Sequence, residues 1–151
     1  MTSRAWCLPL ALLLAAGCSG TEPTERFYTS MIGSSEIPPN GSTSSGTVAF
    51  VHRGDALDYT VVVQLIVGVK SVGLFAGPVD STAPKVADLY TGPVTGAIAS
   101  GILVSGTLTA SSFTGISMDS ALVLMRLSHA SVNVGTASLP NGEIRGVIVP
   151  N

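Results

Sequence analysis

The stretch "LDYTVVVQL", Leu57 to Leu65, has the residue pattern of a half-buried β-strand. Every second side chain from Leu57 to Leu65 is apolar, and Asp58, Thr60 and Gln64 lie between them. Because successive side chains of a strand point to opposite faces, one face of this strand is apolar and the other is mainly polar. An apolar strand face is buried against a second layer, so the stretch predicts a β-rich domain.

Similar strand-like segments lie on both sides of this stretch. The turn signals "PPNGS", "RGD" and "LPNGE" separate them at intervals typical of a β-sandwich. Strands and helices do not alternate, which argues against a nucleotide-binding α/β fold. The predicted strands are 27–32, 47–51, 57–65, 69–75, 86–90, 101–109, 132–136 and 143–149.

One segment, "SMDSALVLMRLSHA", has helical spacing instead. Its apolar residues from Met118 to Met125 recur at helical intervals, and Ser117 or Asp119 is available as the N-cap. We therefore expect one short helix, at about 117–128, before the last two strands. The predicted fold class is all-β, an antiparallel Ig-like β-sandwich with this helix packed across it.

The composition limits the classes of function. A chain of 151 residues has room for one domain with a sizeable core. Only 11% of the residues are charged, and the formal net charge is −2. Proteins that bind nucleic acid neutralise phosphates with clustered Lys and Arg, and this chain has no such cluster. Nucleic acid is therefore not an expected partner.

The N-terminus has the features of a targeting segment. Arg4 precedes the apolar run "LPLALLLAAG", which is shorter than the roughly 20 residues that span a bilayer as a helix. The run ends in "LLAAGCSG", which resembles the lipobox of bacterial lipoproteins, with alanine at position 15 where leucine is more usual. This resemblance implies cleavage before Cys18 and acylation of Cys18. Ser19, rather than aspartate, follows the cysteine, which implies sorting to the outer membrane.

The lipobox resemblance sets the predicted division of the chain. It gives a signal peptide at 1–17, a lipidated cysteine and polar tether at 18–25, and a β-domain at 26–151. Cys7 would be lost with the signal, so Cys18 would be the single remaining cysteine and no internal disulfide is expected. The alternative is an ordinary secretory signal in which Cys18 is incidental.

Three motifs of the β-domain occur in the order and spacing of a known family. They are "EIPP" (Glu36 to Pro39), "SGTVAF" (Ser45 to Phe50) and "VNV…PNGEIRG" (Val132 to Gly146). In this respect the chain resembles the CHRD domain, a module named after chordin, from about Phe27 to Pro150. The motif residues that we expect to be structural are Glu36, Pro38, Pro39, Asn133, Asn141, Gly142, Glu143, Arg145 and Gly146.

The chain departs from the family pattern at three positions. CHRD domains usually carry a His-x-His pair and a further histidine in V-N-V-H-T, where this chain has Gly73, Phe75 and Gly135. Three imidazoles from two strands could form a metal site, or they could form only a hydrogen-bonding cluster. Both readings of the family pattern stay open. In this chain we expect no metal at these positions and no cofactor.

The last motif poses a choice between a reactive site and a closing hairpin. Glu143 and Arg145 are two residues apart on a predicted strand, so they project from the same face and could pair with each other or with neighbouring strands. Asn141-Gly142 is a strong hairpin signal. We therefore interpret the stretch as a closing hairpin.

These observations favour a non-enzymatic, lipid-anchored protein of the cell envelope. Its expected partners are membrane lipid, through acylated Cys18, and an envelope protein or polysaccharide. No serine lies in a G-x-S-x-G elbow. One alternative is metal binding or redox chemistry through other ligands, and another is a hydrolase whose site is assembled only in three dimensions. The candidate metal ligands are Asp80, Asp88, His52 and His129.

Overall fold

A computed structural model describes residues 24–79 and 83–151. The predicted signal peptide, Cys18, most of the tether and Asp80 lie outside the described residues. No helix in these two ranges is long and apolar enough to cross a membrane.

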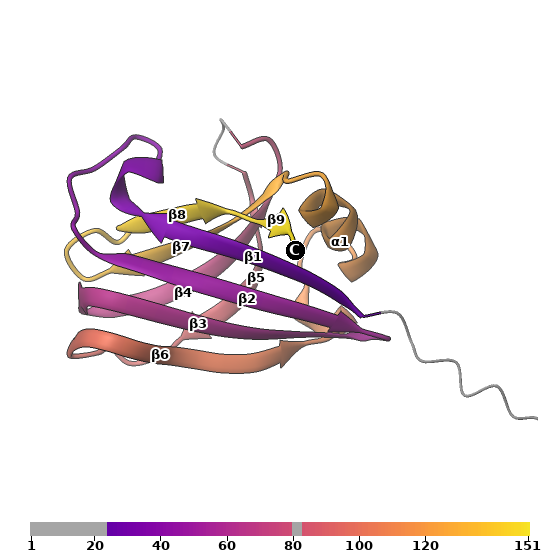
Figure 1. The fold of residues 1–151 in the computed structure, drawn as a ribbon, viewed down its shortest axis with the longest axis horizontal. Coiled ribbons are helices and arrows are strands. Elements are labelled where there is room, and N and C mark those ends of the chain that lie inside the picture. The colour runs from indigo at the N-terminus through magenta and orange to yellow at the C-terminus, as the bar shows by residue number, and fades with distance from the viewer. Residues whose placement is uncertain (1–23, 80–82) are drawn as a thin grey trace, which may run out of the picture.

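The described residues form one antiparallel sheet (Figure 1). Its strand order is β5-β4-β7-β8-β1-β2-β3-β6, and the short β9 also pairs with β1. The strands are β1 (Glu25–Ile32), β2 (Ser45–Arg53), β3 (Ala56–Val67), β4 (Val69–Ala76), β5 (Lys85–Thr91), β6 (Ala97–Leu108), β7 (Ala130–Thr136), β8 (Ile144–Val147) and β9 (Val149–Pro150), and the α-helix is α1 (Met118–Arg126).

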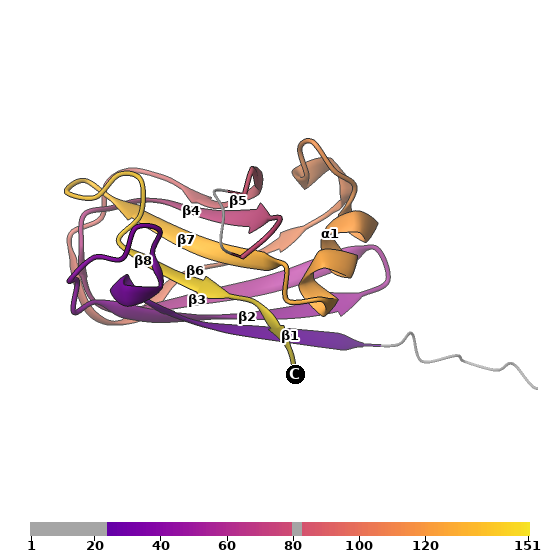
Figure 2. The ribbon, with the colours of Figure 1, turned by 90° about the horizontal axis from the view of Figure 1, so that it is seen from above.

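The sheet curls so that its two halves face each other, with α1 at one end (Figure 2). The Tyr59 hydroxyl on β3 donates a 2.8 Å hydrogen bond to the Leu89 carbonyl on β5, which links the two halves. The predicted antiparallel, mainly β class with one short helix is confirmed. The Ig-like sandwich stays a prediction, because hydrogen bonding runs through one continuous curled sheet.

Alternating apolar side chains fill the space inside the curled sheet. Val48 and Phe50 on β2 are fully buried, as the alternation predicts. The prediction is wrong at Leu65, whose side chain is 67% exposed. The backbone of Leu65 has a φ of 54°, which interrupts the alternation of β3, and Ile66 is buried in its place.

α1 begins where the sequence pattern places a cap. The Ser117 hydroxyl accepts a 3.2 Å hydrogen bond from the Ser120 backbone N–H, so Ser117 is the N-cap. The helix buries Met118, Leu122 and Met125. Its apolar stripe therefore covers one end of the core.

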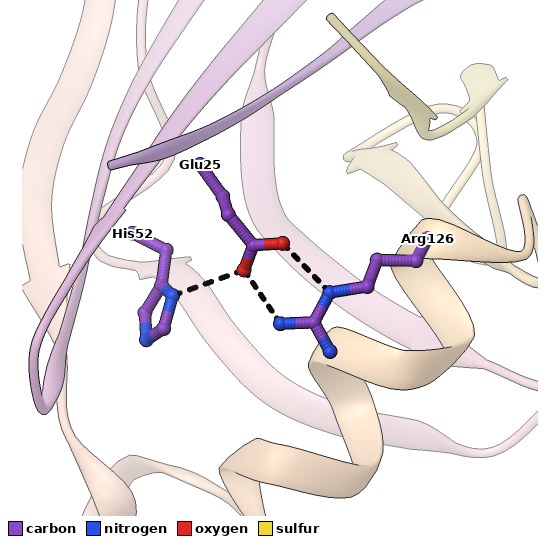
Figure 3. A network of polar contacts seen from close by, with 3 residues as sticks. All are labelled: Glu25, His52 and Arg126. Carbon is purple, nitrogen blue, oxygen red and sulfur yellow. Dashed lines mark hydrogen bonds and ion pairs between the residues drawn. The ribbon is translucent and has the colours of Figure 1, made fainter. Parts of the chain in front are cut away.

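An ion-pair network attaches α1 to the start of β1 (Figure 3). The Arg126 guanidinium donates to both carboxylate oxygens of Glu25, at 2.8 and 2.5 Å, and His52 Nδ1 lies 3.2 Å from Oε2 of the same carboxylate. Hydrogen bonding from Arg126 is the main reason that the pKa of Glu25 is lowered. Glu25 is therefore held as a carboxylate at the start of β1, the end opposite to the segment that contains Glu36.

Candidate functional site

Two of the three motifs, "EIPP" and "VNV…PNGEIRG", meet at one cavity of about 340 Å³. We call it the motif cavity. It lies between the segment that follows β1 and the outward face of β4, β7 and β8. Its lining residues are Glu36, Ile37, Pro38, Phe75, Ala83, Asn133, Asn141 and Arg145.

Strand register explains why residues so distant in sequence line one cavity. Asn133 on β7 pairs with Arg145 on β8 and with Gly73 on β4, and Phe75 pairs with Ser131. Cross-strand partners project from the same face of a sheet. Their neighbours Val72, Leu74, Val132 and Val134 are fully buried on the inner face. Phe75, Asn133 and Arg145 therefore share the outer face.

Glu36 is the buried acid of the cavity. It is 6% exposed, and its Oε2 accepts a 3.3 Å hydrogen bond from the Asn133 side-chain amide. Its Oε1 is buried and has no hydrogen-bond partner among the described residues. Burial raises the pKa of Glu36 to about 7, against the opposing influence of the Arg145 charge and the Ile37 backbone N–H. Glu36, which lines the cavity, thus has a buried and unused acceptor.

The raised pKa predicts how Glu36→Gln changes the pH dependence of stability. Folded Glu36 binds its proton more tightly than unfolded Glu36, so its contribution is full below pH 4.5 and is lost as the pH rises through about 7. The loss amounts to about 3 kcal/mol in the free energy of unfolding. Because glutamine does not titrate, Glu36→Gln should gain about that much relative to wild type between pH 4 and pH 8.

Urea unfolding of both proteins at the two pH values measures this difference. Glu25→Gln is the matched control, because the pKa of Glu25 is lowered and its contribution has the opposite sign. A difference between Glu36→Gln and wild type that stays constant with pH would contradict the assignment of Glu36.

Arg145 is the buried, positively charged residue of the cavity. It is 7% exposed, and its Nε and Nη2 donate to the Ser131 hydroxyl at 3.3 and 3.1 Å. Its Nη1 donates to the Val79 carbonyl at 3.4 Å. Within the described part of the chain, Arg145 forms no ion pair with Glu36 or with Glu143. Arg145 is therefore held in place by neutral acceptors.

Glu143 has a separate, structural set of partners. Its carboxylate accepts hydrogen bonds from the hydroxyls of Ser42 (2.9 Å), Ser44 (2.8 Å) and Thr136 (2.7 Å). Burial by itself would raise the pKa of Glu143, but these hydroxyls outweigh it and lower the pKa. Asn40 also donates to the Glu143 carbonyl at 3.1 Å. Glu143 thus fixes the segment after Glu36 to the β7–β8 connection.

The closing hairpin is confirmed, and its turn reaches the cavity. β7 and β8 pair antiparallel, and the Gly142 N–H donates to the Leu139 carbonyl at 3.1 Å. Gly142 has a φ of 150°, and a Cβ there would lie 2.5 Å from Glu36 Oε2 and 2.6 Å from Asn133 Nδ2. Glycine at 142 therefore allows the turn to approach the Glu36–Asn133 pair.

The three positions without the family histidines share the outer face with the cavity. Ser71 pairs with Gly135, next to the Gly73–Asn133 pair, and Phe75 lines the cavity itself. A Cβ at Gly135 would lie 2.7 Å from the Pro140 carbonyl oxygen. A histidine at 135 would therefore require the β7–β8 connection to move. Glycine at this position allows the Pro140 carbonyl to lie close to β7.

The other predicted residues that the structure describes do not line the motif cavity. Pro39 is exposed, and Gly146 lies against β1. The candidate metal ligands that are described do not come together: Asp88 pairs with Lys85 at 2.6 Å, His52 contacts Glu25, and His129 is exposed after α1. No group of three or more His, Cys, Asp or Glu side chains able to hold a metal occurs in residues 24–79 and 83–151.

A protein-family model described as "CHRD domain" matches residues 27–148, which include every residue that lines the motif cavity. Searches of curated proteins and of solved structures gave no match.

Proposed function

Because this chain belongs to the CHRD domain family, we propose that it is a non-catalytic binding module whose ligand occupies the motif cavity. The observation that carries the proposal is the buried Oε1 of Glu36, which has no partner in the described residues and belongs to a residue that lines the cavity. A buried acceptor without a partner is unfavourable in the free protein, and a ligand that donates to it would remove that cost.

The chemistry of the lining supports binding more than catalysis. A nucleophile needs a neighbouring base that is itself oriented. Ser131 accepts hydrogen bonds from Arg145, while His52 contacts Glu25 on β1 and His129 is exposed. Within the described residues, therefore, neither histidine is placed to activate Ser131.

A second candidate is acid–base hydrolysis by Glu36. Its pKa of about 7 is suited to a general acid or base at neutral pH. Most glycoside hydrolases, however, use two carboxyl groups, and Glu36 is the one carboxyl residue among the described residues lining the cavity. Turnover of envelope glycans by wild type, with at least a hundredfold loss in Glu36→Gln, would favour this candidate over binding.

The binding proposal is tested by filling the cavity. Ala83 lines it, so Ala83→Trp should block access, whereas Ala97→Trp places the same side chain at an exposed position on β6. We expect purified envelope polysaccharide or envelope protein to be retained by wild type and by Ala97→Trp, and retention by Ala83→Trp to fall at least tenfold. Equal retention by all three proteins would argue against the motif cavity as the binding site.

We further propose that the module is anchored to the cell envelope, at the outer membrane, through acylated Cys18. The support is the sequence "LLAAGCSG" and its resemblance to a lipobox. Acyl chains contribute about 0.8 kcal/mol for each buried methylene, so several chains on one residue give stable attachment.

Cys18→Ser should therefore abolish incorporation of radiolabelled palmitate and shift the protein from the membrane fraction to the soluble fraction. Cys7→Ser, which changes the other cysteine, is the control and should leave both properties unchanged. Membrane attachment that persists in Cys18→Ser would contradict the anchor.

A further inference from the structure

The gap between Glu36 and Arg145 indicates what kind of group the motif cavity accepts. Both residues line the cavity, and in the described structure they are not joined by an ion pair. Glu36 Oε1 needs a donor. The described hydrogen bonds of Arg145 use three of the five N–H groups that a guanidinium carries. A hydroxyl group both donates and accepts, so it satisfies both sides at once.

The two asparagines add further hydrogen-bonding groups. The Asn133 amide nitrogen donates to Glu36 and to the Asn141 carbonyl. Its side-chain oxygen and the whole side-chain amide of Asn141 make no hydrogen bond within the described residues. These planar groups can accept from and donate to further hydroxyls, which favours a ligand with several neighbouring hydroxyls.

The rest of the described lining is apolar and without charge. Ile37, Pro38, Phe75 and Ala83 offer a surface against which the C–H face of a ring can pack. Arg145 and ionised Glu36 have opposite charges, and no other charged residue is among the described lining. An anionic ligand would face Glu36 and a cationic ligand would face Arg145, so a neutral ligand fits best.

From these contacts we infer that the motif cavity binds an uncharged sugar ring, as part of a neutral polysaccharide. This inference rests on the proposed binding function and specifies its ligand. A hydroxyl bridges Glu36 and Arg145, neighbouring hydroxyls contact Asn133 and Asn141, and the apolar face of the ring packs on Phe75 and Pro38.

Nuclear magnetic resonance titration of the ¹⁵N-labelled full-length protein tests the inference. The probes are glucose, galactose and mannose, each beside its uronic acid and its amino sugar. We expect at least one neutral hexose to shift the side-chain amide signals of Asn133 and Asn141. It should bind at least tenfold more tightly than both charged counterparts at pH 8.

Variants assign the binding to the cavity. Loss of a hydrogen bond to a charged group should weaken hexose binding about tenfold or more in Glu36→Gln. Glu25→Gln, which changes a carboxylate at the other end of β1, should bind as wild type does. Ala83→Trp should abolish binding. Because Ala83 is partly exposed, this variant provides a second test of the cavity if Glu36→Gln does not fold stably.

Other outcomes separate the ligand class from the binding function. Tighter binding of a uronic acid or an amino sugar, or no shift with any hexose, would overturn the saccharide inference. If the uncharged peptide acetyl-Ala-Pro-amide then shifts the same two amides, the cavity binds a protein segment and the proposed binding function stands. If no probe shifts them and Ala83→Trp also leaves retention of envelope material unchanged, the proposed function fails as well.

Discussion

Gly146→Ala is expected to lower the free energy of unfolding by about 3 kcal/mol, the upper end of the usual range for overpacking. Gly146 on β8 lies against β1, and a Cβ there would collide with the Ser30 carbonyl oxygen and the Thr29 hydroxyl. The Ser30 carbonyl belongs to the backbone of a strand, so it cannot move aside as the end of a flexible side chain can. The substitution would therefore push β8 away from β1.

Urea unfolding of Gly146→Ala and Gly101→Ala checks this expectation. Gly101 lies on β6, and a Cβ there would meet no atom within 4 Å, so the control makes the same chemical change without a collision. Equal stability of the two variants would show that β8 does not approach β1 as closely as the structure indicates.

Arg145→Ala is expected to lower the free energy of unfolding by about 3 kcal/mol at pH 8. Removing one member of a buried set of charges typically costs about 3–5 kcal/mol, and protonation of Glu36 limits the loss. Arg145 lowers the pKa of Glu36, so without it that pKa should rise further above 7. The variant should therefore lose more stability than wild type as the pH rises from 4.5 to 8.

A double-mutant cycle with Glu36→Gln isolates this coupling. At pH 8, Arg145→Ala should cost less in the Glu36→Gln background than in wild type, and at pH 4 the two costs should converge. Arg126→Ala is the control, because this exposed arginine should contribute about 1 kcal/mol or less and should not couple to Glu36. A coupling energy of zero at pH 8 would mean that Arg145 and Glu36 do not share one site.

The strands could be predicted because the spacing of their apolar residues is visible within each short stretch of sequence. In β2, β3 and β7 apolar residues recur at every second position along one face, and the spacing of the residues from Met118 to Met125 identifies α1 in a similar way. The exception at Leu65 has a local cause that composition does not reveal. A leucine with positive φ carries no distinctive sequence signal, because glycine and asparagine are the residues that usually mark such positions.

The motif residues could be identified from the sequence, but not their partners. Glu143 and Arg145 lie close together in the chain, and the sequence left open whether they pair with each other or with residues on neighbouring strands. The structure joins Glu143 to Ser42, Ser44 and Thr136, and joins Arg145 to Ser131. These contacts depend on how the segment after β1 folds back over β8, and single-strand periodicity contains no information about that.

The cavity itself is a product of tertiary structure. Ile37, Phe75 and Ala83 line it, yet none was singled out as a binding residue, because an apolar residue gives no sign of whether it lies in a core or a cavity. In the sequence, Phe75 was notable only because it occupies a position where CHRD domains usually carry a histidine. The pairing of β4 with β7 makes the Phe75 side chain part of the apolar lining of the motif cavity.

The central claim is that the motif cavity is the surface through which this CHRD domain binds its ligand. The most direct test is photo-cross-linking in intact cells, with benzoylphenylalanine in place of Ile37, which lines the cavity and is 41% exposed. The matched control replaces Val123, which is 48% exposed on α1. We expect reproducible cross-links to one envelope component from position 37, none from position 123, and their loss when Ala83→Trp is added. Cross-links of equal yield from both positions, or cross-links from position 37 that persist with Ala83→Trp, would contradict the account.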